Sequence, residues 1–305
     1  MTYTELEHFF ESFLSRLRLQ GVTCAITSGM ACVHFGVAAT TKDCDALCAP
    51  SDAVTFLDVL GETRLGGQGP GYRGNLSAPL DERWLRGGWT SHFHWKLPAD
   101  EAYLDVFGIA PRAITPWEDE TQGLYAGPAT VADMKHTDRD KDWPYITALG
   151  ANLLANGDSR GWLHVFDVDL IEKLVEKAPI PPELVSQRPV LGLALRHDER
   201  LKQAIRVERE AWMELDRARL KVYERAVRPY RSAVQAAKID RDASLSEQHR
   251  LRVACAERAL PQNPIRDYGV DRLTREAEAE LRKLFAPDFL RWLPDPRESF
   301  KLLET

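Results

Sequence analysis

Apolar and polar positions follow one another along the N-terminal part of the chain at spacings that predict helices and strands in turn. Residues 3–20 place large apolar side chains three and four positions apart, the spacing of an amphipathic helix. This stripe consists of Leu6, Phe9, Phe10, Phe13, Leu14 and Leu17. Gly21 ends the predicted helix, and the β-prone run 22–27 follows it as a strand.

Four further elements are predicted before the first long loop. Ser28-Gly29 forms a turn, and residues 30–35 begin a second helix. A second strand covers 41–48, and a third helix covers 51–60 with Ser51 as its N-cap.

A glycine-rich segment over 61–90 interrupts this pattern. A loop of that length inside a compact domain is usually functional or mobile. Within it, Tyr72 and Arg73 are candidates for contact with a base or a phosphate. Two strands, over 90–97 and 102–107, are predicted beyond it.

From about residue 130 onward the pattern is helical. Prolines gather in the segment 178–192, which indicates a boundary. Residues 201–226 have the apolar seam of a long helix, which Pro229 kinks or ends. A second helix over 245–260 is expected to return antiparallel to it.

The whole pattern predicts an α+β protein in two parts. Residues 1–150 form a mixed sheet flanked by helices, and residues 151–305 form a mainly helical region with a long helical hairpin.

Composition indicates the class of protein and the compartment in which we expect it. The chain has 305 residues, of which 44% are hydrophobic and 28% charged, so it can bury a core and is not disordered. No apolar run is long enough for a membrane span, and the acidic N-terminal helix is no signal peptide. Four of the five cysteines lie between Cys24 and Cys48, a poor disulfide framework that favours a reducing compartment, so we expect a cytoplasmic protein.

Charge is distributed unevenly. Residues 196–258 carry a net charge of +5, whereas the remainder carries −11. A solvated helical pair explains this excess, and a basic arm that holds RNA or another polyanion is the alternative.

The residues with the clearest chemistry are Asp43 and Asp45, two positions apart on a predicted strand. Alternation along a strand points both carboxylates to one face, where they repel each other. A divalent cation relieves that repulsion, and carboxylate oxygens suit Mg²⁺. Upstream, the small residues Ser28 and Gly29 would let backbone amides approach a phosphate chain.

The segment 28–45 resembles the nucleotidyltransferase superfamily, which includes polymerase beta. It is most similar to the minimal and abortive-infection-type members, which share a "Gly-Gly-x-Ala … His-Gly … Thr-x-Asp-x-Asp" pattern. The matching positions are Gly29, Ala31, Gly36, Thr41, Asp43 and Asp45. A second match is Lys135-His-Thr-Asp-Arg-Asp-Lys-Asp142, similar to the "Lys … Arg-x-Lys-Asp" helix of that group. The resemblance covers about residues 5–150.

The resemblance implies a catalytic site and a reaction. Asp43, Asp45 and a third carboxylate, Asp105, would bind Mg²⁺ or Mn²⁺ and act in catalysis. The NTP would be bound by Ser28, Gly29, Thr41, Lys135 and Lys141. The protein would transfer a nucleoside monophosphate from the NTP to an acceptor hydroxyl of RNA (tRNA included), a protein or a small molecule, with ATP among the expected nucleotides.

A toxin or defence role is implied by analogy with the abortive-infection-type members, and an antitoxin or self-association through the C-terminal helices would fit that role. Two alternatives stay open. Ser28 and Ala39 depart from the family pattern, which favours a non-catalytic protein of the same fold that binds a partner through its helical arm. A metal-dependent phosphohydrolase is the other.

Several weaker motifs have structural explanations. Asp167-Val-Asp169 has the same spacing as the first acidic pair but is expected to cap a helix. His92 and His94 lie on one strand face without a third zinc ligand nearby, so packing or contact with a substrate loop is expected. The cysteines and the tryptophans at 84, 89 and 95 are expected in the core, and Gly66–Gly71 is not a P-loop.

Overall fold

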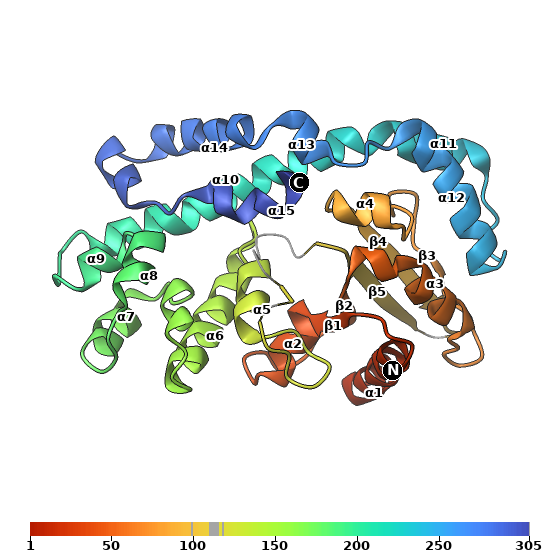
Figure 1. Ribbon diagram of the computed structural model, residues 1–305, viewed down its shortest axis with the longest axis horizontal. Helices are drawn as coiled ribbons and strands as arrows, with labels where there is room; N and C mark the ends of the chain where they lie inside the picture. The colour runs from red at the N-terminus through yellow and green to blue at the C-terminus, as the bar shows by residue number, and fades with distance from the viewer. Residues whose placement is uncertain (99, 110–115, 118, 305) are drawn as a thin grey trace.

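The computed structural model describes residues 1–98, 100–109, 116–117 and 119–304 (Figure 1). Its five strands are β1 (Cys24–Thr27), β2 (Asp43–Cys48), β3 (Gly71–Tyr72), β4 (Thr90–Lys96) and β5 (Glu101–Phe107). The α-helices before the predicted boundary are α1 (Tyr3–Leu19), α2 (Ser28–His34), α3 (Ala53–Glu62), α4 (Glu82–Arg86), α5 (Pro128–Met134), α6 (Trp143–Ala155) and α7 (Val168–Val175). The later ones are α8 (Pro182–Gln187), α9 (Leu191–Ala194), α10 (Leu201–Ala226), α11 (Arg228–Ala237), α12 (Leu245–Ala259), α13 (Pro264–Tyr268), α14 (Val270–Leu284) and α15 (Lys301–Glu304). Short 3-10 turns are η1 (Pro50–Asp52), η2 (Asp140–Asp142), η3 (Ser159–Leu163), η4 (Pro287–Trp292) and η5 (Pro296–Phe300). The molecule is therefore an α+β protein, as the pattern predicts.

The strands form one mixed sheet in the order β1-β2-β5-β4-β3. Only β2 and β5 run parallel, with Asp45 opposite Asp105, and the other neighbours are antiparallel. Two strands that are distant in the sequence are thus brought together at the middle of the sheet.

The two faces of the sheet differ sharply. Alternate residues of β2, β4 and β5 are fully buried beneath α1 and α3; they include Cys44, Ala46, Phe93, Trp95, Leu104 and Val106. The residues between them, among them Asp43, Asp45, His92 and Asp105, are only half-buried. One face is therefore apolar core, and the opposite face carries the ionisable side chains.

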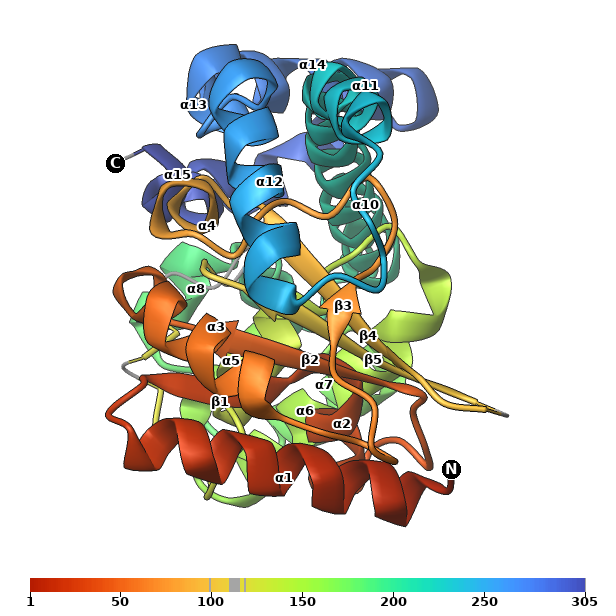
Figure 2. The ribbon, with the colours of Figure 1, turned by 90° about the vertical axis from the view of Figure 1, so that its right-hand side faces the viewer.

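The C-terminal helices form an arm across the top of the molecule (Figure 1). α10 and α14 pack along each other, and α11 continues beyond α10. α12 packs against α11, α3 and β3, so it descends over the edge of the sheet (Figure 2). Gln248 of α12 accepts a hydrogen bond from the Tyr72 amide at 3.1 Å, which covers the free edge of β3.

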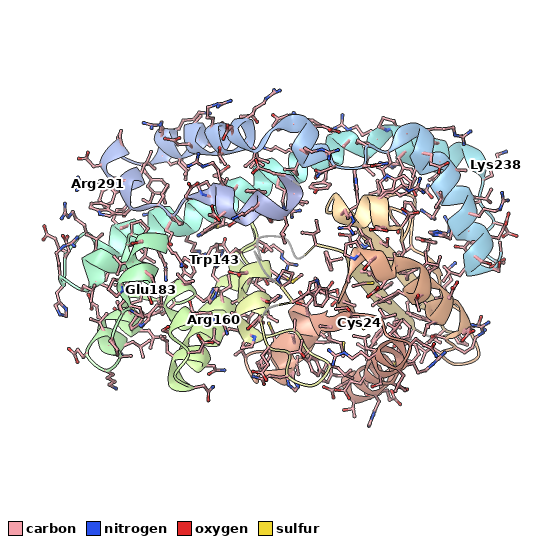
Figure 3. The ribbon with its side chains drawn as sticks, viewed as in Figure 1. Cys24, Trp143, Arg160, Glu183, Lys238 and Arg291 are labelled. Atoms are coloured by element: carbon pink, nitrogen blue, oxygen red, sulfur yellow. The ribbon has the colours of Figure 1, made fainter. Side chains whose placement is uncertain are left out.

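The core is continuous along much of the chain. The largest cluster of buried apolar residues extends from Leu6 to Leu245 and includes residues of α7, α8 and α10. Trp143 is the first residue of α6 (Figure 3), and the guanidinium of Arg209 from α10 lies over its ring. The predicted boundary segment contributes Arg188, whose guanidinium binds Glu208 of α10. The division of the chain at 178–192 stays a prediction.

Four details of the predicted pattern are wrong. Ser28 and Gly29 are the first residues of α2 and do not form a separate turn before it. Ser51 makes no cap bond to α3, which is preceded by the 3-10 turn η1 with Pro50 at its first position. The segment 61–90 contains β3 and α4 and is not a continuous loop. The helix that runs along α10 is α14, because α12 packs on α11 and the sheet. Within the described part of the chain, no helix combines the length and apolarity needed to cross a bilayer.

Candidate functional site

A row of polar side chains crosses the half-buried face of the sheet. The pairing registers place Thr27, Asp45, Asp105 and His92 opposite one another on β1, β2, β5 and β4. The row ends at Arg73, whose amide donates to the His92 carbonyl at 2.9 Å. Asp43 lies on the same face, two residues before Asp45. The structure therefore brings the three carboxylates predicted from the sequence to one place, although their function stays a prediction.

The surroundings of Asp45 disfavour its charged form. Burial raises its pKa to about 7, and the neighbouring charges of Asp43 and Asp105 add to the rise. A hydrogen bond with Ser28 and the positive charge of Lys135 oppose it. Burial and like charges both disfavour an ionised carboxylate, so a cation bound beside Asp45 would favour its charged form.

Asp43 is held by the turn that precedes β2. Thr41 Oγ1 donates to its Oδ1 at 2.8 Å. Thr41 in turn lies against α2, where an added β-carbon on Gly29 would come within 2.6 Å of Thr41 Oγ1. Glycine at position 29 is thus required by close approach to the threonine, and the two predicted residues are parts of one contact.

Ser28 occupies an unusual backbone position at the start of α2. Its φ of 52° lies in the left-handed region, which costs a non-glycine residue about 1–2 kcal/mol. The side chain lies between Asp45 and Lys135, whose Nζ is 3.4 Å from Ser28 Oγ. Strain at a residue that contacts two charged groups is typical of functional sites.

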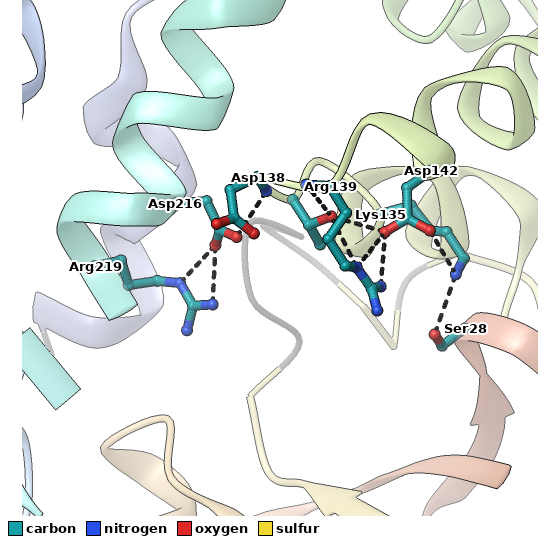
Figure 4. Close-up of polar contacts among 8 residues, drawn as sticks. Ser28, Lys135, Asp138, Arg139, Asp142, Asp216 and Arg219 are labelled. Atoms are coloured by element: carbon teal, nitrogen blue, oxygen red, sulfur yellow. Dashed lines mark hydrogen bonds and ion pairs between the residues drawn. The ribbon is translucent and has the colours of Figure 1, made fainter. Parts of the chain in front are cut away.

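Lys135 is buried, with only 7% of its side chain exposed, and it lies between Ser28 and Asp142 (Figure 4). Its Nζ lies 3.5 Å from Asp142 Oδ1, and Arg139 binds the other oxygen of that carboxylate. Lys135 and Arg139 therefore contact both oxygens of Asp142, and the neighbouring Lys141 is exposed. A role for Lys141 in binding the NTP is not tested.

The loop after Lys135 is also fixed by the C-terminal arm. The amide of Asp138 donates to Asp216 of α10 at 3.0 Å, and Arg219 binds the same carboxylate (Figure 4). Sequence analysis gave no role to Asp216, because no motif connects a helix in the arm with a loop so far upstream.

The carboxylate of Asp105 contacts two basic side chains. Arg73 donates from one nitrogen to both carboxylate oxygens, at 2.8 and 3.1 Å, and His92 Nδ1 lies 2.8 Å from Oδ1. The His92 contact follows from the antiparallel register of β4 and β5, which cannot be predicted from local sequence patterns. Arg73 comes from the glycine-rich segment, and its proximity to a carboxylate had no sequence signal.

The donor chemistry of this face suits Mg²⁺, since three carboxylates converge, and burial and two acidic neighbours raise the pKa of one of them to about 7. In the part of the chain that the structure describes, however, no group of three or more histidine, cysteine, aspartate or glutamate side chains is disposed to hold an ion as it stands. The ion pair with Arg73 accounts for this difference on the side of Asp105, because it uses both oxygens.

The weaker motifs have the structural roles expected of them. Asp167 is the N-cap of α7 and accepts from the Leu170 amide at 2.8 Å. The five cysteines are free and buried; Cys24 lies in the sheet region (Figure 3). The tryptophans at 84, 89 and 95 are buried as well.

Comparison with known proteins assigns no family to this chain. The chain matches no protein-family model, and no curated protein sequence matches it.

Proposed function

We propose that this protein is a Mg²⁺-dependent nucleotidyltransferase of the polymerase beta-like superfamily. It transfers a nucleoside monophosphate from an NTP to an acceptor hydroxyl, and the acceptor is RNA, a protein or a small molecule. The single observation that carries the proposal is the register of β2 and β5, which sets Asp45 beside Asp105 with Asp43 on the same face. Three carboxylates from two separate segments converge there as this chemistry requires.

The groups around the carboxylates support the same reaction. Asp43, Asp45 and Asp105 would hold the ion, which would offset their charge and that of the phosphate chain. Thr41 fixes Asp43, and Gly29 leaves room for that contact. Ser28 and Lys135 lie together at the edge of the cluster, where a hydroxyl and an ammonium group would bind phosphate oxygens.

The end of the polar row at β4 is open to solvent. His92 and Arg73 lie at that end, and both side chains are about a third exposed. The basic segment 196–258 adds positive charge in the arm, which favours a polyanionic acceptor such as RNA. A toxin or defence role, regulated by an antitoxin, is consistent with this acceptor and rests on the resemblance alone.

Label transfer tests the proposal directly. The purified chain is incubated with each α-labelled NTP and Mg²⁺ in the presence of total RNA or lysate protein. We expect one acceptor to become labelled and Asp43→Ala to abolish the labelling. Asp169→Ala is the matched control, since it removes an exposed carboxylate of the same type of pair. Absence of transfer with every nucleotide, or full transfer by Asp43→Ala, contradicts the proposal.

A second candidate is a non-catalytic protein that keeps this fold and binds a partner through its arm. The observation in its favour is the occupation of Asp105 by Arg73, which leaves no ready group of metal ligands in the described residues. Calorimetric titration with NTP and Mg²⁺ separates the two, because only the enzyme is expected to bind nucleotide in a metal-dependent way.

A further inference from the structure

Arg73 holds the cation position at the third carboxylate. Its guanidinium bonds both oxygens of Asp105 and also stacks 4.8 Å from the centre of the Tyr103 ring. Yet 36% of its side chain is exposed, against 17% for Asp105. The guanidinium is therefore the more exposed member of the pair, and it bonds both oxygens that a cation at this carboxylate would use.

The backbone on each side of Arg73 is anchored by α12. Gln248 accepts from the Tyr72 amide, and Arg252 donates to the carbonyl of Gly74 at 2.6 Å. Arg252 is buried and stacks on the Tyr72 ring, with 4.6 Å between the guanidinium and the ring centre. The main chain of this segment is thus held in place, whereas the Arg73 side chain is about a third exposed and is held by Asp105 and by the Tyr103 ring.

Charge explains why an arginine stands here. Without Arg73, the three carboxylates would face one another with Lys135, which acts on Asp45 but also pairs with Asp142, as a counter-charge. Removal of an opposite charge from such a cluster leaves like charges uncompensated. A guanidinium at Asp105 supplies the missing charge while no ion is bound.

We propose that Arg73 is a substrate-binding residue that exchanges partners: it neutralises Asp105 in the free protein and moves to the phosphate chain when a divalent cation takes its place at the carboxylates. This inference rests on the proposed function, since it assigns a further residue to the same site. A guanidinium forms equally good bidentate bonds with carboxylate and phosphate, so the exchange replaces one strong pair by another.

The exchange predicts effects of opposite sign on two ligands. Arg73→Gln removes the competing cation, so Mn²⁺ alone should bind about tenfold more tightly than to the wild type. The same variant lacks the phosphate contact, so the Mn²⁺ complex of tripolyphosphate should bind about tenfold more weakly. A residue that only supports the local structure would weaken both.

Calorimetry with MnCl₂ and with Mn²⁺–tripolyphosphate measures the two affinities without any transfer reaction. Arg250→Gln is the matched control: it changes the net charge equally, and its guanidinium is exposed and pairs with Glu247. It should behave as the wild type. Arg73→Lys keeps the charge, guards against a folding defect, and should fall between Arg73→Gln and the wild type for both ligands.

The outcomes distinguish this inference from the proposed function. Unchanged or weaker Mn²⁺ binding by Arg73→Gln overturns the exchange, even if the wild type transfers nucleotide. Unchanged binding of Mn²⁺–tripolyphosphate overturns it as well. Tighter Mn²⁺ binding with weaker tripolyphosphate binding supports the exchange, even if label transfer fails with every acceptor.

Discussion

Two sets of buried or half-buried carboxylates in the described part of the chain differ in how their charges are compensated. Arg188 and Glu208 are almost wholly buried, at 3% and 1% side-chain exposure, and Arg188 also donates to the carbonyls of Trp162 and Val165. Each charge there has its opposite. Asp43, Asp45 and Asp105 instead share too few cations, and the pKa of Asp45 rises to about 7 as a result of burial and of its two acidic neighbours.

The difference separates a structural ion pair from a candidate binding site. A balanced buried pair connects two parts of a fold and gains nothing from an added ion. An acidic cluster with unmatched charge is less stable by itself and gains from any ligand that supplies positive charge. Four substitutions test this comparison, and they follow in order of the size of their expected effect.

The largest effect is expected from Glu208→Gln. It leaves the Arg188 guanidinium buried beside a neutral amide, so we expect a loss of about 3–5 kcal/mol in the free energy of unfolding. Urea denaturation monitored by circular dichroism measures it. Glu210→Gln is the control, since that carboxylate belongs to a more exposed pair with Arg217 and should cost at most about 1 kcal/mol. Equal losses for the two variants would show that the buried pair is no stronger than the surface one.

Asp45→Asn should instead raise the free energy of unfolding, by an amount that depends on pH. The folded protein holds the Asp45 proton up to about pH 7, against an ordinary pKa of 3.8, so ionisation lowers the wild-type stability as the pH rises through this window. The asparagine variant lacks this loss. It should be more stable than the wild type at pH 8 by a few kcal/mol, at about 1.4 kcal/mol per pKa unit, with little or no gain at pH 4.

Denaturation of both proteins at several pH values gives the difference curve. Asp169→Asn, at an exposed position, should give a flat curve over the same range. A flat curve for Asp45→Asn would mean that the cluster is already neutralised. Saturating Mg²⁺ is expected to reduce the advantage of Asp45→Asn at pH 8, because the ion supplies the charge that the wild type lacks.

Gly29→Ala tests the packing behind the cluster. Its β-carbon would meet Thr41 Oγ1 at 2.6 Å and displace the threonine from Asp43, at a cost of about 1–3 kcal/mol for overpacking. Gly61→Ala is the matched control, because a β-carbon there meets only Leu245 at 4.0 Å within a helix. It should be neutral or stabilising by up to about 1 kcal/mol. Thermal unfolding of the two variants compares them, and equal melting temperatures would contradict the close contact.

Local signals in the sequence predicted much of this arrangement. The apolar stripe of α1, the strands that carry Asp43 and Asp105, and the end of α10 before Pro229 are each determined by residues close together in the chain. The placement of both acidic residues on one face followed from strand alternation alone. These features are local, so periodicity was enough.

The rest depends on contacts between distant segments. Arg73 meets Asp105 only because β3 and β4 pair in one particular register, and Gln248 covers β3 only because α12 turns away from α10. Asp216 of α10 accepts a hydrogen bond from the Asp138 amide and so holds a loop that lies far upstream in the sequence. Periodicity describes which face of an element is apolar but not which partner covers it, so the pairing of α10 with α14 was missed.

The smallest effect is expected at the second acidic pair, which has the same spacing as the first. Asp167 accepts from the Leu170 amide at the start of α7, so Asp167→Ala should cost about 1 kcal/mol, the usual value of an N-cap. Asp167→Asn keeps an acceptor oxygen and should retain most of the stability. Neither variant should change Mn²⁺ affinity or label transfer, because the cap is balanced by backbone amides. A loss of Mn²⁺ binding in Asp167→Ala would mean that spacing, and not the charge balance of the surroundings, marks the site.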